Sequence, residues 1–343
     1  SITDSVRCVF GEELQNAIIE IKDDLPLQDS DFLWVPDNSI KNNKPSWAED
    51  LNSTLPQQPT ENLEETRDIR GGEIALYIFT SGTTGLPKPA IIYQRRIMSA
   101  HPPYSKLGFH ATASDRMYIC LPLYHITGLL LGACTCFYTG SSMFLRRRFS
   151  ARHFWPEVQK YNTTLFIYVG ELCRYLTVQE KCSDEKNNPI RSMLGNGLRP
   201  DIWDHFRNRF GVKRITEIYG ASESNVSFLN FFNKDYTIGT GIVATMLVEY
   251  DIDLDRIVLD DQGRPVKVAD GKTGLLLGRI DDKFLYDGYK NEEASSTKVL
   301  KNVKETGDRW FNTGDLIRRV DVGFAMGMPH YQFIDRVGDT FRD

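Results

Sequence analysis

The sequence predicts an α/β fold in which a mostly parallel sheet with helices is followed by a smaller, antiparallel β-rich region. Between residues 74 and 219, short apolar runs typical of strands alternate with helical patterns. Repetition of strand, helix and strand at this spacing indicates a parallel sheet. After about residue 235, short strands alternate with turns such as Asp261-Gln262-Gly263, which is typical of antiparallel structure.

Length, charge and cysteine content limit the class of protein. A chain of 343 residues suits about two domains with sizeable cores. The 41 Lys and Arg residues against 46 Asp and Glu residues give a formal net charge of −5. This balance disfavours a nucleic-acid partner, since such binders carry a basic excess or stripe. Six cysteines and a start without a basic leader predict reduced thiols and a cytoplasmic location.

The predicted elements follow one another in three groups. The first group has a strand at 7–10, a helix at 11–22 and a strand at 32–35, followed by a Pro- and Asn-rich surface loop at 36–67. The second has strands at 74–79, 90–93, 117–121, 165–169, 192–194 and 215–219, with helices at 154–161, 171–178 and 200–210. The third has strands at 248–250, 256–259 and 274–279.

Residues 126–145 carry no charge and are just long enough to cross a bilayer. The stretch contains three glycines and scattered Thr and Ser residues. A helix at 129–138, a glycine turn and a strand at 142–145 explain it better. We therefore expect a buried core helix rather than a membrane span.

Residues 77–88 join a predicted strand to a loop of small and hydroxylated residues that ends at Lys88. Glycines permit close backbone approach, hydroxyls can donate, and the lysine supplies a point charge, so the loop suits a polyphosphate. It is not a Walker P-loop, because Pro87 and Pro89 flank the lysine where that motif has Gly and Ser or Thr. The candidate phosphate contacts are Thr80, Ser81, Gly82, Thr83, Thr84, Gly85 and Lys88.

This loop resembles the phosphate loop of the adenylate-forming superfamily, which comprises acyl-CoA synthetases, peptide-synthetase adenylation domains and luciferases. Four further motifs occur in the family's order. Residues 195–200 resemble the adenine-contacting turn, 219–223 the Tyr-Gly-x-Thr/Ser-Glu motif, 310–315 the Tyr-x-Thr-Gly-Asp motif and 335–342 the hinge motif. The turn and the hinge motif have the form of the very-long-chain acyl-CoA synthetase or fatty acid transport protein branch. The resemblance runs from about residue 74 to the end of the chain.

The resemblance implies a role for each motif residue. Glu223 would hold Mg²⁺, Ser222 would donate to the α-phosphate, and Tyr219 would lie against the adenine ring; taken alone, Glu223 is equally a surface charge and Tyr219 a buried strand aromatic. His125 would lie near the acyl carboxylate and α-phosphate, although a lone histidine is more often structural. The remaining adenine-side contacts are Gly195, Asn196, Gly197, Gly220 and Ala221.

The ribose contacts come from the last two motifs. Asp315 follows Thr313-Gly314 and is expected in an exposed turn, where a carboxylate can accept from both ribose hydroxyls. Arg336 would pair with ribose or phosphate oxygens. Its alternative is a salt bridge to Asp335 or Asp339.

The implied activity is an ATP- and Mg²⁺-dependent ligase that joins a long- or very-long-chain fatty acid to coenzyme A through an acyl adenylate. Carboxylate attack on the α-phosphate needs no protein nucleophile, so catalysis rests on positioning and on neutralising charge. Two alternatives stay open. One is a fatty-acid uptake component associated peripherally with a membrane, and the other is a fragment that binds nucleotide without turnover.

The predicted domains are an α/β AMP-binding region at 1–235, a β-rich subdomain at 236–335 and the start of a hinge at 336–343. Compared with the family's pattern, most of the strand-helix portion before the phosphate loop is missing. The C-terminal lid domain, which carries a lysine that stabilises the adenylation transition state, is also absent. We therefore expect this chain to bind ATP with Mg²⁺, or an acyl adenylate, but to adenylate weakly.

Overall fold

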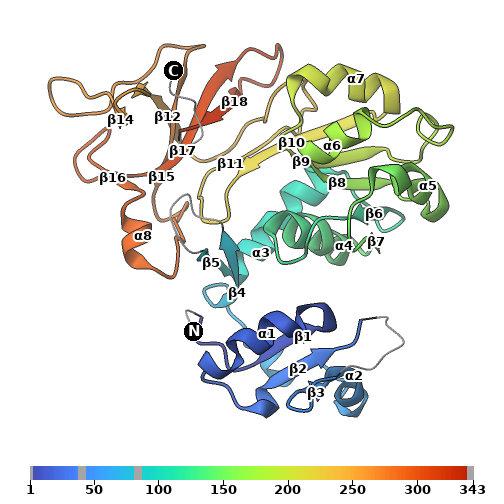
Figure 1. The fold of residues 1–343 in the computed structure, drawn as a ribbon. Coiled ribbons are helices and arrows are strands. Elements are labelled where there is room, and N and C mark those ends of the chain that lie inside the picture. Colours follow the sequence, from blue (N-terminus) through green and yellow to red (C-terminus); the bar gives the residue numbers. More distant parts are fainter. Residues whose placement is uncertain (1–2, 38–43, 81–86, 338–343) are drawn as a thin grey trace. The chain divides into compact units, whose positions relative to one another are not determined.

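The computed structural model describes residues 3–37, 44–80 and 87–337, and the chain divides into two compact units, Ser1–Arg70 and Gly71–Asp343. This division does not test the boundaries predicted at 235 and 335, which stay predictions. The two units are coloured from blue to red along the chain in Figure 1.

The first unit is a small parallel sheet with short helices. Its strands are β1 (Cys8–Gly11), β2 (Phe32–Val35) and β3 (Glu49–Asp50), paired in that order. Its helical segments are η1 (Glu12–Leu14), α1 (Gln15–Ile21), η2 (Lys22–Asp24), η3 (Asp29–Asp31), α2 (Leu51–Thr54), η4 (Leu55–Gln57) and η5 (Glu64–Arg67). The predicted loop at 36–67 is therefore partly wrong. Trp47 and Ala48 join the core of Phe10, Phe32 and Trp34, and this anchors the segment next to β3.

The second unit is built on a six-stranded sheet in the order β11-β10-β9-β8-β6-β7. All neighbours are parallel except β11, which is antiparallel to β10. The strands are β6 (Arg116–Ile119), β7 (Ser142–Leu145), β8 (Leu165–Val169), β9 (Ser192–Asn196), β10 (Arg214–Gly220) and β11 (Ser227–Leu229). The parallel sheet predicted from the strand-helix alternation is confirmed here.

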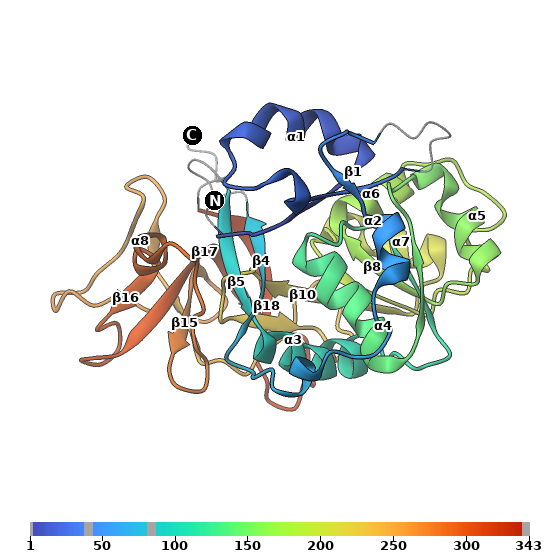
Figure 2. The ribbon, with the colours of Figure 1, turned by 90° about the horizontal axis from the view of Figure 1, so that it is seen from below.

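Helices cover both faces of this sheet, because successive strand residues point to opposite sides. Tyr118 and Phe166 pack with α5 (Ala151–Tyr161), α6 (Gly170–Thr177) and α7 (Pro200–Phe210). On the other face, apolar strand residues such as Met117, Ile119 and Leu165 pack with residues of η6 (Pro102–Gly108), η7 (Thr127–Ala133) and α4 (Cys134–Thr139). Helix α3 (Gln94–His101) contacts these three segments. Figure 1 shows α6 and α7 on the side of the strands opposite to α3 and α4. Figure 2 looks from below and shows α3 and α4 in front.

The uncharged stretch at 126–145 forms η7, α4 and β7, as expected of a core helix followed by a strand. Leu130, Leu131 and Cys136 are buried. Gly140 ends α4 with a φ of 73°, a left-handed conformation that glycine adopts without strain. In the part of the chain that the structure describes, no helix is both long enough and apolar enough to span a bilayer.

Two predicted strands of the parallel sheet lie elsewhere. Strands β4 (Ile74–Thr80) and β5 (Lys88–Tyr93) form an antiparallel pair of their own, with Thr80 opposite Lys88. Assigning them to the parallel sheet was wrong, because the short connection between them leaves no room for a crossover helix. An antiparallel bridge from Ala90 to Tyr289 adds a later segment to this pair.

The β-rich region is a second sheet in the order β12-β15-β17-β16, with β18 also paired to β17. Its strands are β12 (Thr245–Val248), β15 (Thr273–Ile280), β16 (Val299–Lys301), β17 (Arg309–Val320) and β18 (His330–Arg336), all paired antiparallel. A small pair, β13 (Tyr250–Asp251) with β14 (Arg256–Ile257), and helix α8 (Glu292–Ser296) complete it. The predicted antiparallel character is confirmed, although β16, β17 and β18 were not predicted.

Candidate functional site

The carboxyl ends of the parallel strands meet at one edge of the sheet, where open α/β folds bind their ligands. The segment that leads to His125 follows β6, Gly170 follows β8, and Gly197 follows β9. The 220–224 loop, which comprises residues Gly220 to Ser224, follows β10. The topology therefore brings two of the sequence motifs, 195–200 and 219–223, to the same edge as the segment that leads to His125.

A phosphate-side cluster joins the ends of β4 and β5 to the 220–224 loop through a tyrosine. The Thr80 hydroxyl donates to the Lys88 carbonyl at 3.3 Å, and the Lys88 ammonium lies 5.9 Å from the centre of the Tyr289 ring. The Tyr289 hydroxyl interacts with both Glu223 and Thr80, and burial and the Glu223 carboxylate raise its pKa. Three predicted residues thus meet around a fourth that was not predicted. The predicted contacts Ser81, Gly82, Thr83, Thr84 and Gly85 lie outside the described residues.

The 220–224 loop is a tight turn with its serines buried. Ser222 and Ser224 are both buried, whereas Glu223 is half-buried. The Ser224 N–H donates to the Ala221 carbonyl at 3.1 Å, and the Ser224 hydroxyl accepts from the Val226 N–H at 2.9 Å. The turn places the Glu223 carboxylate toward Tyr289 at the phosphate side.

A buried carboxylate on β17 joins the two sheets of the second unit. The Tyr219 hydroxyl donates to Asp315 at 2.6 Å, and Arg336 Nε donates to the other Asp315 oxygen at 3.0 Å. Burial and the Asp315 carboxylate raise the pKa of the Tyr219 hydroxyl well above its usual value. The expectation that Asp315 lies in an exposed turn was wrong, since it is 3% exposed within β17, opposite Arg336 on β18.

The surroundings of Asp315 explain this difference. The Thr313 hydroxyl accepts from the Asp315 N–H at 3.1 Å and donates to the Leu276 carbonyl at 2.9 Å. At the same place, the pairing of β15 with β17 shifts in register between Leu275 and Leu277. The Thr-Gly pair is therefore an irregularity inside a long strand. Arg336 pairs with Asp315, while its own backbone N–H donates to Asp335 at 2.8 Å.

The predicted adenine-side turn is held by a residue that the sequence motifs did not single out. The carboxylate of Glu217, on β10, accepts from the N–H groups of Gly197 at 2.8 Å and Leu198 at 3.0 Å, and from the Tyr168 hydroxyl. Burial raises the pKa of Glu217 to about 7, although these three hydrogen bonds lower it. An acidic residue within the apolar run 214–220 was the available signal, because a charge in a buried strand needs partners.

Gly195, Asn196 and Gly197 form the end of β9 and its turn. Gly197 has a φ of 83°, a left-handed value that favours glycine. A Cβ atom on Gly170, at the end of β8, would lie 1.6 Å from the Gly197 carbonyl oxygen. The backbones of these neighbouring turns therefore approach as closely as glycine allows.

Among the hydrogen bonds of the described residues, His125 has none to the phosphate-side cluster or to Asp315. Its side chain is exposed, and its Nδ1 accepts from the Thr127 N–H at 3.4 Å. Its backbone N–H and carbonyl bond to Pro122 and Leu129 at the start of η7. These local hydrogen bonds are typical of a residue at the start of a helix. The role of His125 near the acyl carboxylate stays a prediction.

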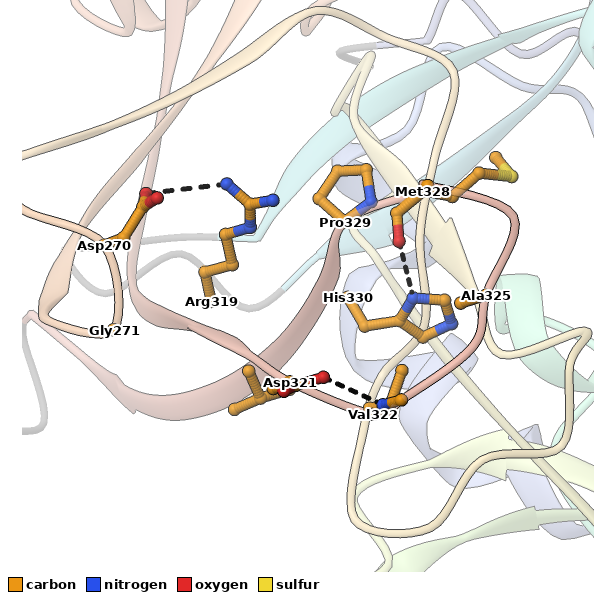
Figure 3. A pocket seen from close by; sticks show the side chains of 12 residues that line it. Asp270, Gly271, Arg319, Asp321, Val322, Ala325, Met328, Pro329 and His330 are labelled. Atoms are coloured by element: carbon orange, nitrogen blue, oxygen red, sulfur yellow. Dashed lines mark hydrogen bonds and ion pairs between the residues drawn. The ribbon is translucent and has the colours of Figure 1, made fainter.

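Two hollows among the described residues of the second unit bear on the candidate site. One, of about 540 Å³, adjoins the phosphate-side cluster and is lined by Ile74, Tyr77, Ile91, Tyr286, Asp287, Tyr289, Lys290, Ser295, Ser296 and Val299. The other, of about 440 Å³, lies between the turn at Asp270 and the β17–β18 connection. Figure 3 shows Arg319 paired with Asp270, and His330 bonded to the Met328 carbonyl, around it. No residue of the motifs lines this second hollow.

The chain matches known proteins over most of its length. The model of the AMP-binding enzyme family matches residues 5–289, which extends the likeness to the part before residue 74. The medium/long-chain fatty-acid–CoA ligase FadD6 of Mycobacterium tuberculosis is 40% identical over 295 residues, covering 86% of this chain and 48% of that protein. Human long-chain fatty acid transport protein 6 is 37% identical over 342 residues, covering 97% and 53%. The chain therefore spans about half the length of these curated relatives.

Solved structures show the same fold at lower identity. The anthranilate CoA ligase AuaEII in complex with anthranoyl-AMP superposes with a TM-score of 0.75 at 18% identity, covering 97% of this chain and 59% of that one. ATP-bound MatB from Rhodopseudomonas palustris gives a TM-score of 0.69 at 17% identity, covering 98% and 60%.

Proposed function

Because the chain belongs to the AMP-binding enzyme family, we propose that it is the nucleotide-binding part of a fatty-acid–CoA ligase. The intact protein would condense a long- or very-long-chain fatty acid with ATP to an acyl adenylate and pyrophosphate. It would then transfer the acyl group to coenzyme A and release AMP. The observation that carries the proposal is the phosphate-side cluster, where Thr80 and Lys88, from β4 and β5, meet Glu223 around Tyr289.

The nucleoside half of ATP fits the buried carboxylate and the glycine turn. A carboxylate offers about four acceptor positions, and Tyr219 and Arg336 occupy two of those on Asp315. The remaining positions would accept the ribose hydroxyls. The turn 195–197, which Glu217 holds in shape, would lie against the adenine together with Gly220 and Ala221.

The donor set around Glu223 fits Mg²⁺. This ion takes oxygen ligands, and it needs only one or two protein carboxylates beside phosphate oxygens. Glu223 is half-buried at the cluster, with the Tyr289 hydroxyl beside it. When bound, the ion would supply positive charge to the phosphates. Lys88 and Thr80, with residues 81–85, would bind the β- and γ-phosphates, and Ser222 would orient the α-phosphate.

The residues of this chain position the reactants without forming a covalent intermediate. A carboxylate oxygen of the fatty acid forms a bond to the α-phosphorus, while the bond from that phosphorus to pyrophosphate breaks. In the second step the thiol of coenzyme A loses its proton to solvent and its sulfur bonds to the acyl carbon, while AMP leaves with the electrons of the broken acyl–oxygen bond. Charge that builds on the phosphates faces the ammonium of Lys88, which is the electrostatic contribution expected of such a site.

Two substitutions in the phosphate-side cluster test the nucleotide site. Lys88→Met and Glu223→Gln should each lower the affinity of the chain for ATP·Mg²⁺ by about 10-fold or more, the loss expected for one charged contact, with little change in urea unfolding. Lys160→Met is the matched control, because Lys160 is an exposed lysine on α5. If either variant loses binding only in proportion to lost folded protein, its assigned role is wrong.

The acyl substrate is tested in the intact polypeptide beside the 343-residue chain. Relatives named as ligases of medium/long-chain fatty acids and as long-chain fatty acid transport proteins support a fatty-acid substrate. Among acyl-adenylate analogues of graded length, those with long acyl chains should bind most tightly. If affinity is highest for short or bulky acyl groups, the proposed fatty-acid substrate is wrong. Pyrophosphate exchange should be strong in the intact protein and weak in this chain, and equal exchange would contradict the fragment assignment.

A second function is supported by the names of relatives that are fatty acid transport proteins. We propose that the intact protein works at a membrane surface, where ligation would trap incoming fatty acid. Sedimentation with liposomes of neutral and anionic lipids tests this association. Recovery of the intact protein only in the supernatant, while it retains ligase activity, would support the ligase without the surface role.

A further inference from the structure

Arg96 lies outside every sequence motif. Its side chain nevertheless contacts the 220–224 loop, which carries Ser222 and Glu223. Arg96 lies on α3, which begins directly after β5 and therefore close in sequence to Lys88. One Nη group donates to the Ser222 carbonyl. The other donates to the Ala221 carbonyl at 3.0 Å and to the Ser224 carbonyl at 3.2 Å. A single side chain thus contacts three carbonyls within four consecutive residues.

The chemistry of this contact favours arginine. A guanidinium is a planar fork of donors, so two nitrogens can hold neighbouring carbonyls in a fixed relative orientation, whereas a lysine ammonium is a compact point charge. Burial lowers the pKa of Arg96, and the Asp287 and Glu223 carboxylates act in the opposite direction. The side chain therefore stays in a partly desolvated position where its hydrogen bonds are strong.

Arg96 also lies where the segments of the phosphate-side cluster converge. Its neighbour Arg95 forms an ion pair with Asp287, and Asp287 precedes Tyr289 by two residues. The backbone of the same segment pairs with β5, since the Lys290 N–H donates to the Pro89 carbonyl at 3.1 Å. The start of α3 therefore fixes both the 220–224 loop and the segment that carries Tyr289.

We propose that Arg96 is a positioning residue for the Mg²⁺–phosphate half of the site. By holding the carbonyls of Ala221, Ser222 and Ser224, it sets the backbone direction on both sides of Glu223 and so aims its carboxylate and the Ser222 hydroxyl at the phosphates. This inference rests on the proposed function. It adds that the adenosine half of the site depends on Arg96 only through Ala221, since the Glu217 and Asp315 contacts lie on other segments.

The chain offers a closely matched control for a purely structural role. Arg214, at the start of β10, also holds three backbone carbonyls, those of Gly108 at 2.8 Å, Leu107 at 2.7 Å and Phe231 at 2.8 Å. Burial lowers its pKa as it does for Arg96. These carbonyls belong to η6 and to the segment after β11, which carry none of the proposed phosphate contacts.

The experiment compares Arg96→Met, Arg96→Lys and Arg214→Met in the 343-residue chain. Calorimetry would measure the affinity for ATP over a series of Mg²⁺ concentrations, and separately the affinity for adenosine, with urea unfolding of each variant. Arg96→Met should weaken ATP·Mg²⁺ binding by about 10-fold or more, the loss of one charge-assisted contact, and raise the Mg²⁺ concentration required. Adenosine affinity should fall by about 2-fold at most, because Ala221 is the one proposed adenosine contact that Arg96 holds and the Glu217 and Asp315 contacts remain. Arg96→Lys should fall between wild type and Arg96→Met.

Arg214→Met should lose stability yet keep the wild-type affinity for ATP·Mg²⁺. The inference is overturned if Arg96→Met lowers ATP and adenosine affinities equally, or if it behaves like Arg214→Met. If Arg96→Met does not fold, Arg96→Lys decides by the same two affinities. If the wild-type chain binds ATP·Mg²⁺ no more tightly than adenosine, both this inference and the proposed function are overturned. If Arg96→Met and Arg96→Lys both bind ATP·Mg²⁺ as tightly as the wild-type chain does, the inference is overturned and the proposed function is not.

Discussion

Tyr219 and Asp315 are hydrogen-bonded at 2.6 Å although 96 residues separate them in the sequence. Tyr219 lies on a strand of the parallel sheet, and Asp315 lies on a strand of the antiparallel sheet. The bond places the end of β10, where the 220–224 loop begins, against the carboxylate proposed to hold the ribose. The two halves of the proposed nucleotide site therefore share one structural support.

Asp315→Asn should lower the affinity for adenosine by about 10-fold, because an amide offers one acceptor oxygen where the carboxylate offers two and a charge. Titration of the chain with adenosine measures the change. Asp335→Asn is the control, since Asp335 neighbours Arg336 and accepts only from its backbone N–H among the hydrogen bonds described above. Equal adenosine affinity in wild type and Asp315→Asn would remove Asp315 from the ribose site.

Glu217 should make stability depend on pH below neutrality. Its folded pKa of about 7 lies above the usual 4.5, so between these values the folded state binds a proton that the unfolded state has lost. Stability therefore falls as pH rises from about 4.5 to about 7, by a total of about 3 kcal/mol. The free energy of unfolding, measured with urea at several pH values in this range, should change less with pH in Glu217→Gln than in wild type. The same dependence of the unfolding free energy on pH in both proteins would show that the pKa of Glu217 is not raised in the folded state.

Gly170→Ala should lower both stability and adenosine affinity. The added methyl group would lie 1.6 Å from the Gly197 carbonyl oxygen, so the turn 195–197 must move, at a cost of about 2 kcal/mol or more. Gly72→Ala is the matched control, because a Cβ atom there meets nothing within 4 Å. Thermal unfolding and adenosine titration of the two variants check this. Gly170→Ala with wild-type values would contradict the close approach of the two turns.

Tyr289→Phe should raise the Mg²⁺ concentration required for ATP binding about threefold or more, because the Glu223 carboxylate loses the polar group beside it. The ring and its contact with Lys88 remain, while the hydroxyl beside Glu223 is lost. Tyr77→Phe provides the comparison, since Tyr77 lines the same hollow and its contact with Lys290 involves only the ring. An unchanged Mg²⁺ requirement in Tyr289→Phe would show that its hydroxyl does not orient Glu223.

The parallel sheet could be predicted from the sequence because its strands are buried on both faces. The run 165–169 is apolar throughout, and the helix α6 with clear spacing follows it. Strands β17 and β18 were missed for the opposite reason. They mix charged residues with a Thr-Gly pair, and a glycine next to an acidic residue is typical of turns. The pairing that makes Asp315 a strand residue comes from β15 and β18, which are distant in sequence.

The motif residues could be named from the sequence, but their supports could not. Glu217, Arg96 and Tyr289 contact partners 19 or more residues away. A local signal exists for Glu217, which is a charge within a buried strand, but it does not identify the partners. The roles of the motif residues stay predictions until the variants above are measured. The family itself was recognised correctly from the order of its motifs.

The contacts made by Arg96 also bear on how the chain folds. Arg96 and Ser222 are 126 residues apart, and Arg214 and Leu107 are 107 apart. Closing such loops costs chain entropy before the contacts compensate for it, so long-range pairings form slowly. We expect the parallel strands to pair before either guanidinium reaches its carbonyls. The shape of the 220–224 loop is therefore a late product of folding, so the ability to bind phosphates should be gained after the sheet has formed.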